Sequence, residues 1–313
     1  EVISSYVHNL REFRRWGDRD PVLVAMASDI DRRLRELLAS SLAHDRGVDP
    51  DDLHSTLVAA LLVAGRLAVY ERWLDREVDA GSLVEDQLAV IDYGDVLFRH
   101  EHPLTVPAAI RDQALAIVER GVTLLTLGGD HFITYPLLQA HHAVHGPLSL
   151  IHFDAHSDTW SGEAEGINHG TMFYHAANDG LVVPERSAQI GLRTHNDDHR
   201  GFNVLDANWV QRHGPDAVVA EVKRIVGSNK AYLTFDIDCL DPAYAPGTGT
   251  PVAGGLSSWQ ALAILRGLTG LNLVGMDLVE VSPPYDHADI TALAGATLAV
   301  EFLALLALQK GVA

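Results

Sequence analysis

The sequence predicts an α/β fold, a three-layer doubly wound parallel sheet, preceded by an atypical all-helical segment. After residue 88, short apolar runs alternate with longer stretches of helical periodicity, which is typical of a parallel sheet covered on both faces. Before residue 88, amphipathic runs dominate and strand signals are few. We therefore expect two domains, residues 1–88 and residues 89–313.

The first domain is expected to be a helical unit without a catalytic residue. Pro21 can open a helix that continues to residue 38, and the sequence Asp-Pro-Asp-Asp at 49–52 predicts a turn and a second helix start. Residues 53–74 then repeat apolar positions at helical spacing. Such a face must be buried, and we expect it to cover an open edge of the sheet in the second domain.

The second domain is expected to alternate strands and helices. The apolar runs predict strands at residues 122–127, 148–153, 188–191, 231–237 and 273–278. The intervening periodicity predicts helices at residues 107–120, 133–144, 215–226, 257–268 and 290–309. A loop rich in Pro and Gly at residues 241–255 follows a strand, and such loops often shape a site.

Composition narrows the class of partner. The 313 residues carry 23 Lys and Arg against 42 Asp and Glu, a formal net charge of −19. This balance argues against nucleic acid or an anionic membrane and suits a small cationic substrate. We take residues 57–64 as the most apolar stretch, which is too short to span a bilayer. Cys239 is the only cysteine, so we expect no disulfide within the chain and a packing role for its thiol. The lack of disulfides suits a reducing compartment, and we expect a cytoplasmic location without a signal peptide.

Carboxylates and imidazoles follow three of the predicted strands. The strand at 122–127 leads into Gly-Gly-Asp-His at 128–131, the strand at 148–153 into Asp-Ala-His-Ser-Asp at 154–158, and the strand at 231–235 into Asp-Ile-Asp at 236–238. Ligands of open parallel sheets bind at the carboxyl ends of the strands. We therefore expect one rim to hold these six side chains: His131, Asp154, His156, Asp158, Asp236 and Asp238.

The spacing of these residues predicts a site for two metal ions. In an extended chain Asp154, His156 and Asp158 point the same way, as do Asp236 and Asp238. Four adjacent carboxylates resist ionisation unless cations neutralise them. Mixed carboxylate and imidazole ligands suit Mn²⁺ or a similar first-row ion, and six ligands exceed what one catalytic ion needs.

Each motif alone has a plainer interpretation. A single Asp-x-His can be a surface loop or a helix cap, and His131 could simply belong to a cap of the helix that follows. His141 and His142 lie in a helical stretch, so we interpret them as surface or packing residues. The combination of motifs after buried strands favours metal binding, because unpartnered charges there would cost several kcal/mol.

Together these motifs resemble the ureohydrolase family, which includes arginases and agmatinases. The resemblance covers roughly residues 89–308 and extends through His-Gly-Thr at 169–171, Pro-Gly-Thr-Gly-Thr-Pro at 246–251, Gly-Met-Asp at 275–277 and Glu-Val-Ser-Pro at 280–283. It implies an arginase/deacetylase-like fold with two Mn²⁺ per chain. One ion would be held by His131, Asp154, Asp158 and Asp236, and the other by Asp154, His156, Asp236 and Asp238.

The resemblance also implies the catalytic roles. Glu280 would bind the guanidinium group of the substrate, and His169 would transfer a proton to the leaving amine. From the residues alone, Glu280 could be only a charge at the end of a strand and His169 only a residue at a helix start. A homo-oligomer, a trimer or a hexamer, is the expected assembly in this family.

Within the family the sequence most resembles agmatinases, so the expected reaction is agmatine and water to putrescine and urea. Arginases carry a polar loop after this position of the second motif, whereas this chain has Thr159-Trp160 and the acidic Glu163 and Glu165. An acidic rim should repel the carboxylate of arginine and tolerate the amine of agmatine. A related guanidino acid such as 4-guanidinobutyrate is the alternative substrate.

Residues 1–88 depart from the family pattern. They lack the Gly-Val-Pro-Phe-Asp motif that normally precedes the catalytic region, and they weakly resemble the helical ligand-binding part of a tetracycline-repressor-type regulator. Two further hypotheses stay open. The chain could be a single-metal deacylase of the same fold, or a regulatory fusion whose metal domain is vestigial.

Overall fold

The computed structural model describes residues 32, 36, 90–99, 101–161 and 166–311. Contacts divide the chain into two units, Glu1–Ala89 and Val90–Ala313, and the sheet belongs to the second unit. Arg32 and Glu36 are helical and form an ion pair of 2.6 Å. The rest of the predicted helical segment, and its expected packing on a sheet edge, lie outside the described residues.

The second unit contains a six-stranded, fully parallel sheet in the order β1-β6-β5-β2-β3-β4. The strands are β1 (Leu124–Leu127), β2 (Ser149–Phe153), β3 (Ala188–Ile190), β4 (Asn203–Leu205), β5 (Lys230–Asp236) and β6 (Asn272–Val279). The helices are α5 (Val106–Val118), α6 (Thr134–His145), α7 (Met172–Asn178), α8 (Ala207–Val226), α9 (Ser258–Gly267) and α10 (Ile290–Gln309). The predicted doubly wound α/β fold is confirmed.

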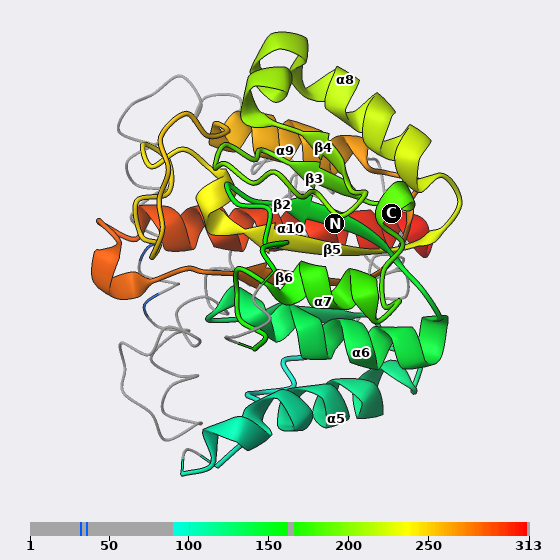
Figure 1. Cartoon of the computed structure of the whole chain (residues 1–313). Helices are drawn as coiled ribbons and strands as arrows, with labels where there is room; N and C mark the ends of the chain where they lie inside the picture. Colours follow the sequence, from blue (N-terminus) through cyan, green and yellow to red (C-terminus); the bar gives the residue numbers. More distant parts are fainter. Residues whose placement is uncertain (1–31, 33–35, 37–89, 100, 162–165, 312–313) are drawn as a thin grey trace, which may run out of the picture. The chain divides into compact units, whose positions relative to one another are not determined.

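The strand order explains why the helices form two layers. From β1 the chain moves through β2 and β3 to β4, whereas from β4 it returns through β5 to β6. Because parallel crossovers are right-handed, helices of the outward path and of the return path cover opposite faces. Figure 1 shows α5, α6 and α7 together on one side of the sheet and α8 on the other. Contacts of α6 with β5 and β6, and of α10 with β6 and α9, complete the two outer layers.

The core is formed by apolar side chains on both faces of the central strands. On the face of α6 and α7, Leu148 and Leu150 pack with Phe173 and Leu138. On the opposite face Phe153 and Phe235 stack with their ring centroids 4.8 Å apart. Strands buried on both faces explain the uninterrupted apolar runs in the sequence.

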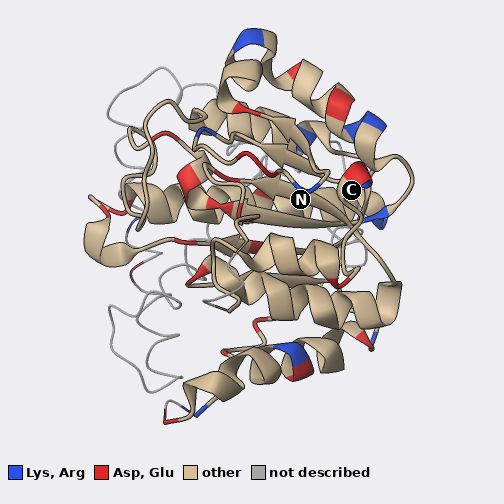
Figure 2. Cartoon of the chain, viewed as in Figure 1, with Lys and Arg blue, Asp and Glu red and all other residues tan. Residues whose placement is uncertain are grey.

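Helix α10 is the most apolar element of the described residues. It is long and apolar enough to cross a membrane by length and composition, whereas residues 57–64, which the sequence analysis took as the most apolar stretch, lie outside the described residues. Figure 2 shows it almost without charged residues, Glu301 being the only one. Its residues Ala292, Ala296, Phe302 and others are buried, and the helix contacts β6 and α9.

Three details differ from the prediction. Strand β4 and helix α7 were not predicted because they contain only three and seven residues. Helix α8 has two helical segments: the predicted one from Pro215, and an earlier one that was not predicted and begins after Asp206, whose side chain accepts a hydrogen bond from the Trp209 amide. Gly214 takes a φ of 78° just before the proline, so the helix kinks there and continues.

Candidate metal centre

The site lies where the winding of the sheet reverses, between β2 and β5. The register pairs Phe153 of β2 with Phe235 of β5, so Asp154 and Asp236 follow side by side at the carboxyl ends of adjacent strands. Parallel sheets bind ligands at this topological switch point, because the connections leave it in opposite directions. The sheet thus brings the predicted carboxylates to one place.

The first group of side chains surrounds the imidazole of His131. Its Nδ1 lies 3.1 Å from Asp154 Oδ2, 3.1 Å from Asp158 Oδ2 and 3.3 Å from Asp236 Oδ2. All four residues are buried. Although it faces three oxygens, His131 Nδ1 makes no hydrogen bond of acceptable geometry. Such a buried, unsatisfied nitrogen amid carboxylates calls for a shared partner.

A hydrogen-bond chain behind His131 assigns its tautomer. The Thr234 hydroxyl donates to Asp277 Oδ1 at 2.5 Å, so the hydroxyl oxygen is left to accept from His131 Nε2 at 2.9 Å. The hydroxyls of Thr134 and Tyr232 also donate to Asp277. Burial lowers the pKa of His131, but Asp154, Asp158 and Asp236 outweigh it and raise the pKa well above its usual value, so the metal-free ring also holds a proton on Nδ1. When a cation displaces that proton, the proton on Nε2 stays and the Nδ1 lone pair would face the metal.

The second group is formed around His156. Its Nδ1 lies 3.2 Å from Asp154 Oδ1 and 3.1 Å from Asp238 Oδ2. Asp238 is fixed by two backbone hydrogen bonds: its Oδ1 accepts from the Ala155 amide at 3.0 Å, and its own amide donates to Asp236 Oδ1 at 2.8 Å. The two groups therefore share Asp154, one oxygen of which faces each group.

The charges of the site are unfavourable without a cation. Burial and the neighbouring Asp154 charge raise the pKa of Asp158 to about 7, and burial raises the pKa of Asp236 well above its usual value. Burial lowers the pKa of His156, but Asp154 and Asp238 outweigh it and raise the pKa to about 10. The metal-free site thus holds protons, which binding of a cation would release.

The donor set fits divalent first-row metal ions. The ligand atoms of His131, Asp154 and Asp158 lie within 4.8 Å of one another, as do those of Asp154, His156 and Asp238. Adjacent donors on an ion with bonds of about 2.1 Å lie about 3 Å apart, close to the 3.1–3.3 Å found around His131 Nδ1. The structure therefore brings all six predicted metal ligands together in a buried His/Asp cluster.

The two predicted catalytic residues form an outer group beside this cluster. Atoms of Asp130, His169 and Glu280 lie within 4.8 Å of one another. His169 Nδ1 lies 3.0 Å from Asp130 Oδ2, and this hydrogen bond and the Asp130 charge raise the pKa of His169. Glu280 Oε1 accepts from the His131 amide at 2.6 Å, and burial raises the pKa of Glu280.

The backbone is strained at two of these positions. Asp158 has a φ of 53° and Glu280 a φ of 63°. Residues other than glycine rarely adopt this left-handed conformation, and they keep it only where the surroundings impose it. At Glu280 the strained turn is fixed by its amide, which donates to the Gly129 carbonyl at 2.8 Å. The strain orients both carboxylates toward the cluster.

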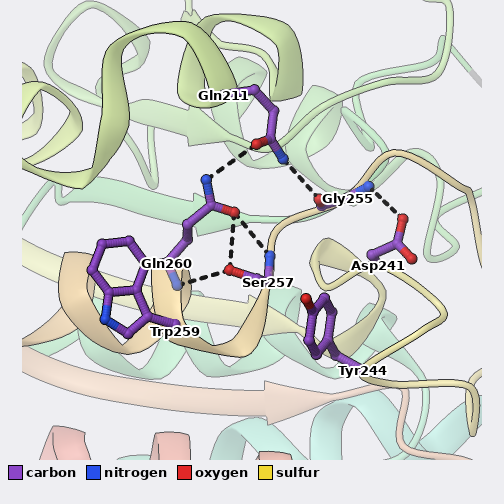
Figure 3. A pocket seen from close by; sticks show the side chains of 7 residues that line it. All are labelled: Gln211, Asp241, Tyr244, Gly255, Ser257, Trp259 and Gln260. Carbon is purple, nitrogen blue, oxygen red and sulfur yellow. Dashed lines mark hydrogen bonds between the residues drawn. The ribbon is translucent and has the colours of Figure 1, made fainter.

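The loop at residues 241–255 reaches the cluster, as the sequence predicted. Thr250 Oγ1 donates to Asp238 Oδ2 at 3.2 Å. Figure 3 shows how the end of this loop is held: Asp241 accepts from the Gly255 amide, and Gln211 donates to the Gly255 carbonyl. The residues in the figure line a pocket of about 390 Å³ that contains none of the predicted ligands.

The arginine that follows β3 fixes the same segment from within the fold. Arg193 donates to the carbonyls of Asp238, Val252 and Gly191. Cys239 is buried behind the cluster, where its Sγ lies 3.5 Å from the Ile190 carbonyl, so its predicted packing role is confirmed. His141 is buried against Tyr232, in agreement with the packing interpretation.

Three residues that contact the candidate site residues or support them were not predicted. Asp130 stood inside the first motif but was given no role, because its pairing with His169 spans 39 residues. His152 lies two positions before Asp154 and donates to it, so the alternation that identified Asp154, His156 and Asp158 could have been extended back to it. Gln189, which contacts His152, lies on a different strand and gave no sequence signal.

Known proteins share this sequence and architecture. The model of the arginase family matches residues 65–305, a start 24 residues before the limit that the motifs suggested. An agmatinase of Chromobacterium violaceum is 53% identical over 227 residues, 72% of this chain and 70% of the relative. A second model, the MftR C-terminal domain, matches residues 18–94, which confirms the resemblance of the N-terminal segment to a regulator of the tetracycline-repressor type.

Two solved structures extend the comparison. A hypothetical agmatinase from Burkholderia thailandensis is 55% identical, with a TM-score of 0.71 over 79% of each chain. Proclavaminate amidino hydrolase from Streptomyces clavuligerus is 33% identical, with a TM-score of 0.69 over 79% of this chain and 85% of that one. With its family match and its buried His/Asp cluster, the chain belongs to the arginase family and is a ureohydrolase.

Proposed function

We propose that the protein is a binuclear manganese agmatinase, which hydrolyses agmatine to putrescine and urea. The observation that carries the proposal is the shared carboxylate of Asp154, with Oδ2 facing His131 and Oδ1 facing His156. A carboxylate with one oxygen toward each of two ligand groups suits a pair of neighbouring ions. The agmatinase relatives at 53% identity support the choice of substrate.

Two ions held by the six ligands would neutralise the buried carboxylates and supply a hydroxide nucleophile near neutral pH. Asp154 and Asp236 would contact both ions, and His131 and Asp158 would complete one site. His156 and Asp238 would complete the other. His131 would bind its ion through Nδ1, because its Nε2 proton is directed at Thr234.

Glu280 would bind and orient the guanidinium group. One oxygen of its carboxylate is fixed by the His131 amide, so the carboxylate is held at the edge of the cluster. A carboxylate matches the planar donors of a guanidinium geometrically. The anionic form is needed for this contact, and a bound guanidinium would counteract the raised pKa of Glu280.

His169 would deliver a proton to the leaving amine. Its Nδ1 is held by Asp130, which leaves Nε2 to face the substrate. The Asp130 carboxylate also raises the pKa of His169, so the imidazolium form persists to higher pH. An imidazole that alternates between both forms near neutral pH suits this transfer.

Metal content and substrate range test the proposal together. Reconstitution with Mn²⁺ and elemental analysis should give two ions per chain, and urea should be released faster from agmatine than from arginine or 4-guanidinobutyrate at equal concentration. A single tightly bound zinc would favour the deacylase hypothesis, and two ions without urea release would favour the regulatory one. Faster release from 4-guanidinobutyrate would move the assignment to a guanidino-acid hydrolase.

The expected substrate selection rests on charge. Glu163 and Glu165 lie outside the described residues, so their contribution stays a prediction from the sequence. Replacing both by Gln should narrow the preference for agmatine over arginine, because an acidic rim disfavours the carboxylate of arginine. We further propose a cytoplasmic homo-oligomer, a trimer or a hexamer, which light scattering would measure.

A further inference from the structure

The shared carboxylate of Asp154 is held by an imidazole that belongs to neither proposed ligand set. His152, on β2, places Nε2 2.8 Å from Asp154 Oδ2. On the other side, the His156 amide donates to Asp154 Oδ1 at 2.6 Å. Both oxygens of Asp154 therefore have a neighbour that fixes the rotation of the carboxylate, and His152 is fully buried.

The position of the proton on His152 follows from its second neighbour. Gln189 Nε2 lies 2.6 Å from the Ser157 carbonyl oxygen and 3.0 Å from His152 Nδ1. The reverse orientation of the amide would set two oxygens 2.6 Å apart, so the NH₂ group must face Ser157. Its other hydrogen then points to His152 Nδ1, which has to accept.

The ring is therefore neutral, with its only proton on Nε2 and directed at Asp154. Phe173 packs against the imidazole with ring centroids 4.6 Å apart and limits its rotation. All the groups involved are buried: Ser157, Gln189 and His152 are at most 2% exposed.

We propose that Ser157, Gln189 and His152 form a positioning relay that holds the Asp154 carboxylate with one oxygen toward each metal site. The Ser157 carbonyl orients the Gln189 amide, the amide fixes the tautomer of His152, and the imidazole N–H fixes Asp154. This inference rests on the proposed two-metal function, and it assigns His152 to the support of a ligand instead of to the metal itself. Hydrogen-bond partners of ligands typically contribute about 10–100-fold to metal affinity.

Calorimetric titration of the metal-free full-length protein with Mn²⁺ tests the relay. His152→Phe keeps a ring of similar shape and removes the donor, and Gln189→Leu removes the group that fixes the tautomer. Each should weaken Mn²⁺ binding about 10–100-fold without a change in the circular dichroism spectrum. His152→Gln retains an N–H and should bind more tightly than His152→Phe. Gln309→Leu, the same exchange in a glutamine that is hydrogen-bonded to Leu273 at the opposite end of β6 from the cluster, should bind like the wild type.

Several outcomes would overturn the relay. Wild-type affinity in His152→Phe and Gln189→Leu would show that neither residue supports Asp154. Equal weakening in His152→Gln and His152→Phe would show that the imidazole is itself a ligand. If His152→Phe does not fold, the comparison of Gln189→Leu with Gln309→Leu decides.

A metal-independent measurement separates this inference from the proposed function. In ¹⁵N NMR spectra of the metal-free protein, His152 should show the Nε2–H tautomer in the wild type and a mixture in Gln189→Leu. An Nδ1–H ring in the wild type would refute the relay whatever the enzyme hydrolyses. Tight Mn²⁺ binding without urea release from agmatine would refute the proposed function and leave the relay intact.

Discussion

Asp158→Asn tests whether the buried carboxylates strain the metal-free protein. Asp158 is buried, and its Oδ2 lies 3.1 Å from His131 Nδ1. Its φ of 53° is tolerated by asparagine better than by most residues, so the exchange adds little backbone strain. The variant therefore removes one charge and one potential ligand and keeps the shape of the side chain.

The magnitude follows from the pKa of Asp158, which burial and the Asp154 charge raise from 3.8 to about 7. At a pH below 3.8, the usual pKa of the group, Asp158 is protonated in both the folded and the unfolded protein and does not affect stability. As the pH rises through about 7, the ionised carboxylate destabilises the folded protein. At about 1.4 kcal/mol per pKa unit, the ionised group costs the metal-free protein up to about 4 kcal/mol. His131 loses one of three carboxylate partners in the variant, so we expect a net gain of about 2–4 kcal/mol at about pH 8 and little change at about pH 4.

Denaturant unfolding in the presence of a chelator measures the difference in free energy of unfolding between Asp158→Asn and the wild type. With Mn²⁺ in place of the chelator, the wild type should become the more stable of the two. With Mn²⁺ the wild type should be stabilised more, because Asp158 is then a ligand and its charge is neutralised. Asp197→Asn, an exchange at a 92% exposed carboxylate, is the control and should stay within about 0.5 kcal/mol of the wild type. An Asp158→Asn protein that is no more stable than the wild type at alkaline pH without metal would refute the reasoning.

Three further variants test the outer group and the scaffold. His169→Ala should slow turnover of agmatine by about 10²–10⁴-fold and leave Mn²⁺ affinity unchanged; loss of metal would contradict its assigned role. Asp130→Asn should lower the pKa of His169, because the carboxylate raises it, so the alkaline limb of the kcat–pH profile should move to lower pH; an unmoved limb would count against His169 as proton donor. Gly191→Ala should destabilise the fold by about 1–3 kcal/mol in denaturant unfolding, because the backbone at residue 191 has a φ of +94° and the added Cβ would lie 2.7 Å from Cys239 Sγ. Adding Cys239→Ala should restore part of that loss.

Features that depend on neighbouring residues along the chain could be predicted from the sequence. Buried strands of a parallel sheet produce continuous apolar runs, and the spacing after β2 predicted that Asp154, His156 and Asp158 gather at one site. The extended chain assumed for that spacing is wrong, because the backbone bends after Phe153 and Asp158 has a φ of 53°. The same local logic missed the short strand β4 and the part of α8 that precedes Pro215. Local patterns also could not decide whether His131 binds metal or only belongs to the cap of the helix that follows.

The sequence by itself determined the α/β class, the family and the residues able to bind metal, because these depend on patterns repeated within a few positions. Only the tertiary structure decided which of them meet. Sheet order set Asp154 beside Asp236, although the two are far apart in the chain, and a strained turn after β6 brought Glu280 to the His131 amide across 149 residues. It also decided the proton positions on His131 and His152, because a tautomer depends on what the second ring nitrogen contacts.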